Sequence, residues 1–393
     1  MRLTFGPAVE AFRQEFLSWL AGNRPTDEEM AAEPALSSAH VPEWASRWTR
    51  RMFDAGWLVP GWPPERGGRN AGPVETLVYL EELTRAGIPR TTNPQGLGII
   101  APSILDYGNA AQIRDYAMPV LRGERAACLG MSEPGAGSDL ASLSTRAVLD
   151  GDSFVINGQK VWTSGANYAD FCFLFCRTDP QAPKHKGISV VLVDMATPGI
   201  TVRPIAQIAR PEYPDLNEVF FSDVVVPKEN LVGKLNDGWA MASGSLAHER
   251  GMVWLSGVLG LERQMAAVLP EARAALARLA PAERAVVADG LVQSAIDAAA
   301  ARCLGYRGFA KLVRGGSAPE QALMKVFTSE ANRRLALRAA DLRGPGATEI
   351  GATPDSDETW MERYFITFGG TISAGSSEIQ RNIIAEKVLG LPR

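Results

Sequence analysis

Residues 130–142 read Gly-Met-Ser-Glu-Pro-Gly-Ala-Gly-Ser-Asp-Leu-Ala-Ser, and residues 160–166 read Lys-Val-Trp-Thr-Ser-Gly-Ala. The first stretch is a glycine-broken turn with small hydroxyl side chains. Gly135 and Gly137 can take positive φ there and let backbone N–H groups approach an anion or a flat heterocycle. The second stretch offers an indole that can cover an aromatic face, with hydroxyl groups beside it to meet ring heteroatoms. Together they predict a flavin held between a polar loop and Trp162.

A dinucleotide-binding fold of the Rossmann type is a poor alternative for the first stretch. Residues 135–140 half-match its glycine fingerprint, but Leu140 stands at the last position and no strand–turn–helix context surrounds it. A generic glycine loop would explain either stretch alone. Both stretches at this short spacing favour a cofactor site.

Composition places the chain among ordinary globular proteins. It has 393 residues, of which 46% are hydrophobic and 21% charged, enough for two or three domains with buried cores. The net charge of −4 argues against nucleic acid and against a membrane surface as partners. We find no apolar run of signal-peptide length at the N-terminus and none of the ~20 residues that a membrane span needs. We therefore expect a cytoplasmic location.

The cysteines and histidines do not suggest a metal site. Cys128, Cys172, Cys176 and Cys303 are scattered along the chain. Cys172 and Cys176 lie in a run that reads as a buried strand, where positions i and i+4 are roughly 13 Å apart, too far for a disulfide or a shared metal. The three histidines lack ligand spacing. We expect no metal.

The order of predicted elements is helical, then β, then helical. An apolar stripe at Val9, Phe12, Phe16 and Leu20 marks a helix in the first part. Short β-branched and aromatic runs follow, as in a small β-barrel or sandwich. These runs are residues 154–156, 171–176, 188–193, 219–221 and 224–226. A second helical stripe runs from Val253 to Val268, and helix breaks are expected near Pro270, Pro281, Gly315 and Gly344.

This order and five motifs resemble the acyl-CoA dehydrogenase family over nearly the whole chain. The motifs are residues 130–142, 161–165, 217–221, 226–233 and 376–386. The resemblance implies an α+β fold with an N-terminal helical domain (residues 1–125), a middle β-barrel domain (126–228) and a C-terminal four-helix bundle (229–393). It also implies FAD, bound between barrel and bundle at a subunit boundary.

The same likeness assigns site residues. Met131 and Ser132 would face the flavin ring, and Ser138 the pyrophosphate. Trp162 would cover the isoalloxazine, and Ser164 would sit near its N5. The full set assigned to FAD is Leu129, Met131, Ser132, Gly137, Ser138, Trp162, Thr163, Ser164, Ser376 and Glu378.

The reaction that the resemblance implies is α,β-dehydrogenation of an acyl-CoA thioester. A carboxylate takes the α-proton while the β-hydrogen leaves as hydride to flavin N5. Many relatives carry the base just before the glycine of the last motif, where this chain has Ala374. A minority use a glutamate early in the first long helix of the bundle, and Glu249 matches that position. A simple charged pair of Glu249 and Arg250 near a helix start is the alternative. Ala374 (through its amide), Ser138 and Arg250 are the expected substrate contacts.

Two segments that are usual in the family are missing from this chain, and their absence bears on its oligomeric state. The usual Arg-x-x-Phe-Gly segment has no match between Leu269 and Val287, and residues 340–346 replace the usual Gln-x-x-Gly-Gly-x-Gly. In lacking these segments the chain resembles the actinobacterial branch of the family, whose members act on steroid side chains and other bulky acyl-CoAs and often form mixed tetramers. The resemblance thus implies a homo- or hetero-oligomer (dimer or tetramer), with an electron-transfer flavoprotein as acceptor.

Three other functions remain open at this point. One is a flavin monooxygenase or oxidase of the same fold, against which Glu249 counts because such relatives generally have no thioester base. Another is a non-catalytic subunit that completes the site of a second chain. The last is a dehydrogenase that acts on carrier-protein-bound acyl groups.

Overall fold

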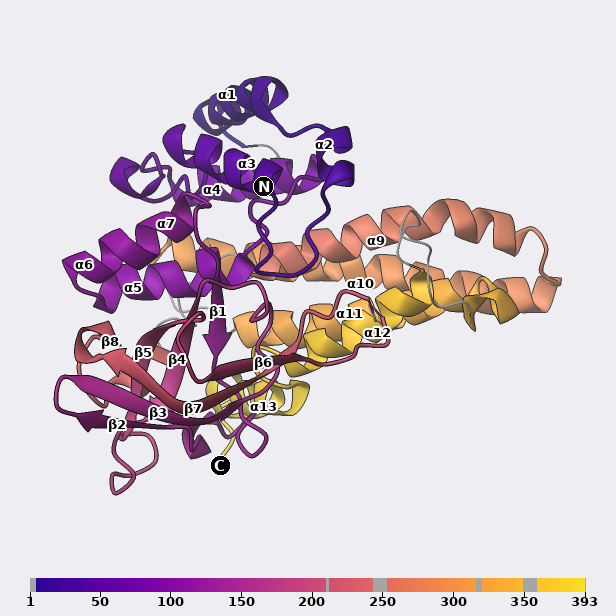
Figure 1. Cartoon of the computed structure of the whole chain (residues 1–393). Helices are drawn as coiled ribbons and strands as arrows, with labels where there is room; N and C mark the ends of the chain where they lie inside the picture. The colour runs from indigo at the N-terminus through magenta and orange to yellow at the C-terminus, as the bar shows by residue number, and fades with distance from the viewer. Residues whose placement is uncertain (1–4, 210–211, 243–252, 316–319, 349–358, 393) are drawn as a thin grey trace. The chain divides into compact units, whose positions relative to one another are not determined.

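The computed structural model describes residues 5–209, 212–242, 253–315, 320–348 and 359–392. The chain forms two compact units, one of residues 1–206 and 212–249 and the other of residues 207–211 and 250–393. The predicted mixed α+β class, with helical, β and helical parts in that order, is confirmed (Figure 1). The domain boundaries expected after residues 125 and 228 stay predictions.

Short helices make up the N-terminal part of the first unit. They are α1 (Pro7–Asn23), α2 (Asp27–Ala32), α3 (Glu43–Asp54), α4 (Pro73–Arg85), α5 (Ala101–Tyr107), α6 (Ala110–Gln112) and α7 (Met118–Leu121). The start of α2 is a capping box: Thr26 Oγ1 accepts from the N–H of Glu29, and the Glu29 carboxylate accepts from the N–H of Thr26. The predicted stripe of α1 is confirmed, because Phe16 and Leu20 are buried in the core of this unit.

Within the described residues, eight strands form one sheet. They are β1 (Ala127–Gly130), β2 (Arg146–Asp150), β3 (Ser153–Lys160), β4 (Phe171–Arg177), β5 (Ile188–Asp194), β6 (Ile200–Pro204), β7 (Asn217–Pro227) and β8 (Leu231–Val232). The order is β6-β7-β3-β2-β4-β5-β8, and β1 pairs with β4 in parallel. The two runs predicted separately at 219–221 and 224–226 are one strand. Asp223 between them has a φ of 50°, but Asn157 accepts its N–H at 2.9 Å and the β3–β7 ladder continues past it.

Strand β4 is buried on both faces, which explains its unbroken apolar sequence. Phe171, Phe173 and Phe175 pack in the same core as the N-terminal helices. Cys172, Leu174 and Cys176 face a second core, to which β3 contributes Phe154 and Ile156, and β7 contributes Phe221 and Val224. Strands far along the sheet therefore meet over one interior, in the manner of a barrel. The helices and the sheet share a core and form a single unit.

The second unit is helical, with α9 (Val253–Leu276), α10 (Pro281–Val313), α11 (Glu320–Asp341), α12 (Trp360–Ile372) and α13 (Ser377–Ile383). Helix α11 packs against α9, α10 and α12. The expected break near Pro270 is wrong, because α9 runs through it to Leu276. The missing proline N–H costs one helical hydrogen bond, but Val268 and Ala272 on either side are buried in the core. The breaks near Pro281, Gly315 and Gly344 are confirmed.

The four cysteines are free. Cys128, Cys172 and Cys176 are buried, and Cys303 on α10 is exposed. Burial raises the pKa of the Cys176 thiol to about 12, and hydrogen bonding to Cys172 followed by burial raises the pKa of Cys128. Among the described residues, no three His, Cys, Asp or Glu side chains are grouped to hold a metal ion. Of the helices in the described ranges, none has both the length and the apolar character to cross a bilayer.

Candidate active site

The polar loop after β1 closes on itself in a tight turn. The N–H of Glu133 donates to the Ala136 carbonyl at 2.9 Å, and the N–H of Ala136 donates to the Glu133 carbonyl at 3.0 Å. Neither Gly135 nor Gly137 uses the positive φ that is open to glycine, and these two hydrogen bonds close the turn without a left-handed residue. A Cβ added to either glycine would meet nothing within 4 Å, so the protein itself does not require glycine there.

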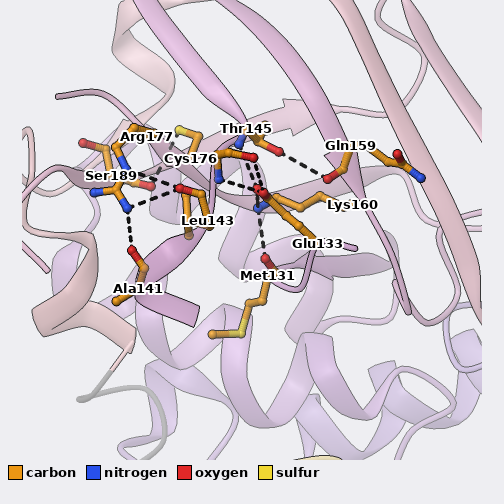
Figure 2. Close-up of polar contacts among 11 residues, drawn as sticks. Met131, Glu133, Ala141, Leu143, Thr145, Gln159, Lys160, Cys176, Arg177 and Ser189 are labelled. Carbon is orange, nitrogen blue, oxygen red and sulfur yellow. Dashed lines mark hydrogen bonds and ion pairs between the residues drawn. The ribbon is translucent and has the colours of Figure 1, made fainter. Parts of the chain in front are cut away.

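This loop is attached directly to the segment that contains Trp162. The N–H of Val161 donates to the Ser132 carbonyl at 2.9 Å. Lys160 Nζ, at the end of β3, donates to the Met131 carbonyl at 2.9 Å and to Glu133 Oε1 at 2.8 Å (Figure 2). These contacts join two segments that carry eight of the expected FAD residues: Leu129, Met131, Ser132, Gly137 and Ser138 in the first, and Trp162, Thr163 and Ser164 in the second.

Glu133 and Lys160 form an ion pair inside the protein. The side chain of Lys160 is 0% exposed and that of Glu133 is 4% exposed. Burial alone would raise the pKa of Glu133, but the charge of Lys160 and hydrogen bonds from Lys160, Thr145 and Ser144 outweigh it and lower that pKa to about 2. Complete burial lowers the pKa of Lys160, against the opposing charge of Glu133. The carboxylate is therefore ionised at neutral pH.

The far end of the loop has its own anchor. Arg177, at the end of β4, donates from Nη2 to the Ala141 carbonyl at 2.6 Å and to the Leu143 carbonyl at 3.3 Å (Figure 2). Both ends of the loop are thus held by cationic side chains from the sheet, while Gly137 and Ser138 between them are exposed. The loop is thus held in place at both ends and exposes small residues between them.

Trp162 has an unusual backbone conformation. Its φ is 60°, which is rare for a bulky aromatic residue, and the residue is 57% exposed. The flanking backbone enforces this conformation: the N–H of Thr163 donates to the Asn217 carbonyl at 3.0 Å, and Asn217 Nδ2 donates to the Thr163 carbonyl at 3.1 Å. A strained backbone conformation persists where several surrounding contacts hold it in place, and such conformations are common at ligand sites. The indole is presented outward as an open apolar face.

A turn in the second unit carries the remaining residues. After α12, Ala374 and Gly375 have φ values of 53° and 88°. Gln380 Nε2 donates to the Ala374 carbonyl at 3.0 Å, and Lys325 Nζ from α11 donates to the Gly375 carbonyl at 2.5 Å. Ser376 caps α13 through Oγ, and Glu378 lies exposed in its first turn. The N–H of Ala374 has no acceptor within the described chain, so this amide is available to a ligand.

Glu249, the expected base, and Arg250, an expected substrate contact, lie at 243–252, outside the described residues. Trp254 and Trp360 are buried in the second unit. Trp254 packs so closely on α10 that a Cβ added to Gly305 would lie 2.1 Å from its ring.

Sequence reasoning missed Glu133, Lys160 and Lys325. For Lys160 a signal existed in the alternation of β3, because Lys160 lies on the same face of the strand as the buried residues Phe154 and Ile156. A lysine on a buried face implies a buried partner of opposite charge. Lys325 lies 50 positions from its acceptor Gly375, and nothing in its local sequence indicates the contact.

Known proteins share this architecture. Three models of the acyl-CoA dehydrogenase family match the chain: the N-terminal domain at residues 10–124, the middle domain at 128–224 and the C-terminal domain at 236–389. Acyl-CoA dehydrogenase IpdE1 of Mycobacterium tuberculosis is 37% identical over 395 residues, which cover 98% of both chains.

The chain belongs to the acyl-CoA dehydrogenase family.

Solved structures agree with this assignment. The Tcur3481-Tcur3483 steroid ACAD superposes with a TM-score of 0.82 at 30% identity, and the ChsE4-ChsE5 complex from Mycobacterium tuberculosis with a TM-score of 0.79 at 32% identity. Both comparisons cover 100% of each chain. This acyl-CoA dehydrogenase is an oxidoreductase that acts on an acyl-CoA, and its family typically binds FAD.

The loop of this dehydrogenase suits such a cofactor. The space beside Gly135 and Gly137 is open, which would let a ligand approach the backbone closely. Thr163 is buried, and its Oγ1 has no hydrogen-bond partner among the described residues. The exposed indole of Trp162 offers an apolar face that a flat heterocycle can cover.

Proposed function

We propose that this dehydrogenase binds FAD and oxidises the α,β bond of an acyl-CoA thioester to the 2-enoyl-CoA. The observation that carries the proposal is the hydrogen-bonded juxtaposition of Ser132 and Val161, which puts the glycine loop beside the outward-facing Trp162. In the proposed site Met131, Ser132 and Ser164 meet the flavin ring, Trp162 covers it, and Ser138 meets the pyrophosphate. Leu129, Gly137, Thr163, Ser376 and Glu378 complete the cofactor contacts.

The turn after α12 supports the proposed role of Ala374. Enolate charge develops on the thioester oxygen as the α-proton leaves, so a preorganised donor there lowers the barrier. The Ala374 N–H has no acceptor among the described residues, and Gln380 and Lys325 hold the carbonyls of Ala374 and Gly375, which orients the turn. Ser138 and Arg250 are the further substrate contacts that we propose. When bound, FAD would supply the acceptor for the β-hydrogen, which would leave as hydride to flavin N5.

Glu249 is our proposed base. The side chain of Ala374 cannot accept a proton, so the position used by many relatives is not catalytic here, whereas Glu249 matches the position used by a minority. A general base of this kind contributes about 10²–10⁴-fold to the rate. Glu249→Gln should therefore keep the yellow cofactor but reduce turnover by that factor, measured as anaerobic bleaching of the flavin by acyl-CoA. Glu283→Gln, an exposed carboxylate in the first turn of α10, is the control and should bleach like the wild type.

The substrate that we propose is a bulky acyl-CoA of the steroid side-chain type, with an electron-transfer flavoprotein as acceptor. Support comes from the two missing family segments and from likeness to a structure named as a steroid ACAD. A panel of short, branched, long and ring-bearing acyl-CoAs, scored by bleaching, tests the class. Preference for short linear chains would contradict it. Bleaching by an acyl carrier protein but by no CoA ester would favour the carrier-bound alternative, and rapid reoxidation by O₂ would favour an oxidase or monooxygenase.

A second candidate is a partner subunit of a heteromeric dehydrogenase. The observation in its favour is the structural neighbour described as a ChsE4-ChsE5 complex, together with Ala374 in place of a carboxylate. We propose an oligomer, homomeric or heteromeric. Purification of the chain alone tests the two: flavin retained in the single-chain preparation supports a complete site, whereas flavin that appears only on co-expression with a related chain supports the partner role.

A further inference from the structure

The charge pair of Glu133 and Lys160 joins the two segments that we propose to hold the flavin. Lys160 Nζ contacts Glu133 Oε1 at 2.8 Å and the Met131 carbonyl at 2.9 Å. Glu133 also accepts from Ser144 N at 2.7 Å, Ser144 Oγ at 2.8 Å and Thr145 N at 2.9 Å. The loop, the segment that leads into β2 and the end of β3 thus meet at one carboxylate and one ammonium group (Figure 2).

Stability alone does not account for this pair. The desolvation of two charges roughly offsets their attraction, and replacement of a buried ion pair by apolar side chains is often neutral or stabilising. What the pair does supply is a fixed geometry. All three donors at Ser144 and Thr145 and the carbonyl of Met131 are hydrogen-bonded to it.

The geometry has a direct effect on the Met131–Ser132 peptide. Its carbonyl oxygen faces Lys160 Nζ, so the N–H of Ser132, which lies on the opposite edge of the same planar unit, faces away from the pair. That N–H has no acceptor among the described residues. A cation on the carbonyl also polarises the peptide and makes its N–H a stronger donor.

We propose that Glu133 and Lys160 are positioning residues that aim and strengthen the Ser132 N–H toward the flavin ring, and so set FAD affinity and flavin potential without contact with the cofactor. This proposal rests on the proposed function, because it requires FAD in the loop. A donor aimed at an electron-rich ring atom binds the reduced flavin more strongly than the oxidised one. Loss of the pair should therefore weaken FAD binding and lower the flavin potential.

The test uses the double variant Glu133→Gln with Lys160→Met, which removes both charges together. Lys228→Met is the matched control, since it removes the exposed ion pair with Asp152 at the other end of β3. The measurements are the melting temperature of the apoprotein, the FAD dissociation constant by titration of the apoprotein, and the flavin midpoint potential by equilibration with a reference dye.

We expect the double variant to melt within a few degrees of the wild type but to bind FAD at least tenfold more weakly. A tenfold lower preference for the reduced flavin corresponds to a potential about 30 mV lower for a two-electron couple. The control should match the wild type in all three measurements. A double variant with wild-type melting, FAD affinity and potential would overturn the proposal.

A variant that keeps the charges covers the case in which the double variant does not fold. Glu133→Asp is one methylene shorter and cannot reach Lys160 and the Ser144–Thr145 donors together, so it should also bind FAD about tenfold more weakly. Wild-type affinity in this variant would overturn the proposal as well. The two proposals fail differently: a wild-type apoprotein that binds no FAD defeats the proposed function and this inference with it, whereas wild-type binding that is equal in all variants defeats the inference alone.

Discussion

Acid should weaken the first unit through the carboxyl group of Glu133. Its ordinary pKa is 4.5, and although burial acts to raise it, Lys160 and the surrounding donors hold it at about 2 in the folded protein. Because the folded value lies below the unfolded one, Glu133 stabilises the fold above about pH 4.5, and this contribution is lost as the pH falls toward 2.

The magnitude follows from the two pKa values. They differ by about 2.5 units, and one unit is worth 1.36 kcal/mol, so at pH 7 the fold is about 3 kcal/mol more stable with Glu133 ionised than it would be with Glu133 protonated beside Lys160. About 2 kcal/mol of this should disappear between pH 7 and pH 3. That is a large fraction of the stability of a typical domain.

Urea unfolding of the apoprotein at the two pH values measures this loss. Tryptophan fluorescence reports mainly the first unit, because seven of the nine tryptophans belong to it. The variant Glu133→Gln/Lys160→Met carries neither titrating group, so its loss between pH 7 and pH 3 should be about 2 kcal/mol smaller than that of the wild type. Asp152→Asn, which alters an exposed carboxylate just before β3, should leave the wild-type loss nearly unchanged. Equal losses in the wild type and the double variant would refute the reasoning.

Three further changes test other parts of the structure. Lys325→Met removes the charged donor on the Gly375 carbonyl and should slow flavin reduction by acyl-CoA about tenfold in stopped-flow measurements, with FAD content unchanged; an unchanged rate would deny Lys325 a role in the turn. Ser164→Ala should slow the same step about fivefold, as loss of one neutral hydrogen bond would. Gly305→Ala would bring a Cβ to 2.1 Å from Trp254 and should destabilise the second unit by about 1–3 kcal/mol in thermal unfolding. Gly308→Ala in the same helix, where a Cβ meets nothing within 4 Å, should leave stability unchanged or raise it by up to about 1 kcal/mol.

Much of the architecture could be predicted from periodicity. The unbroken apolar run of β4 predicts a strand buried on both faces, and the stripe that includes Leu261, Met265 and Val268 predicts the buried face of α9. Local rules failed where tertiary contacts decide the outcome. Pro270 does not end α9 because its neighbours are held in the core, and Asp223 does not end β7 because Asn157 accepts its N–H.

The candidate site was predictable only in part. Motifs singled out the glycine loop and Trp162 as candidates, but not the backbone conformations that present them. Ala374 takes a left-handed φ that alanine normally avoids, and its turn is held by Lys325 from a different helix. Residue type indicates which side chains can do chemistry, whereas the side chains that orient them are found only when the chain is folded.

One of the four thiols is accessible to chemical labelling. Cys303 is the one exposed cysteine, and the other three are buried inside the first unit, so a maleimide dye at neutral pH should attach once per chain. The number of dye photobleaching steps in a single labelled particle would then give the number of copies of the chain in each assembly. Labelling one of two co-purified chains would show in the same experiment whether the particle is built from one kind of subunit or two.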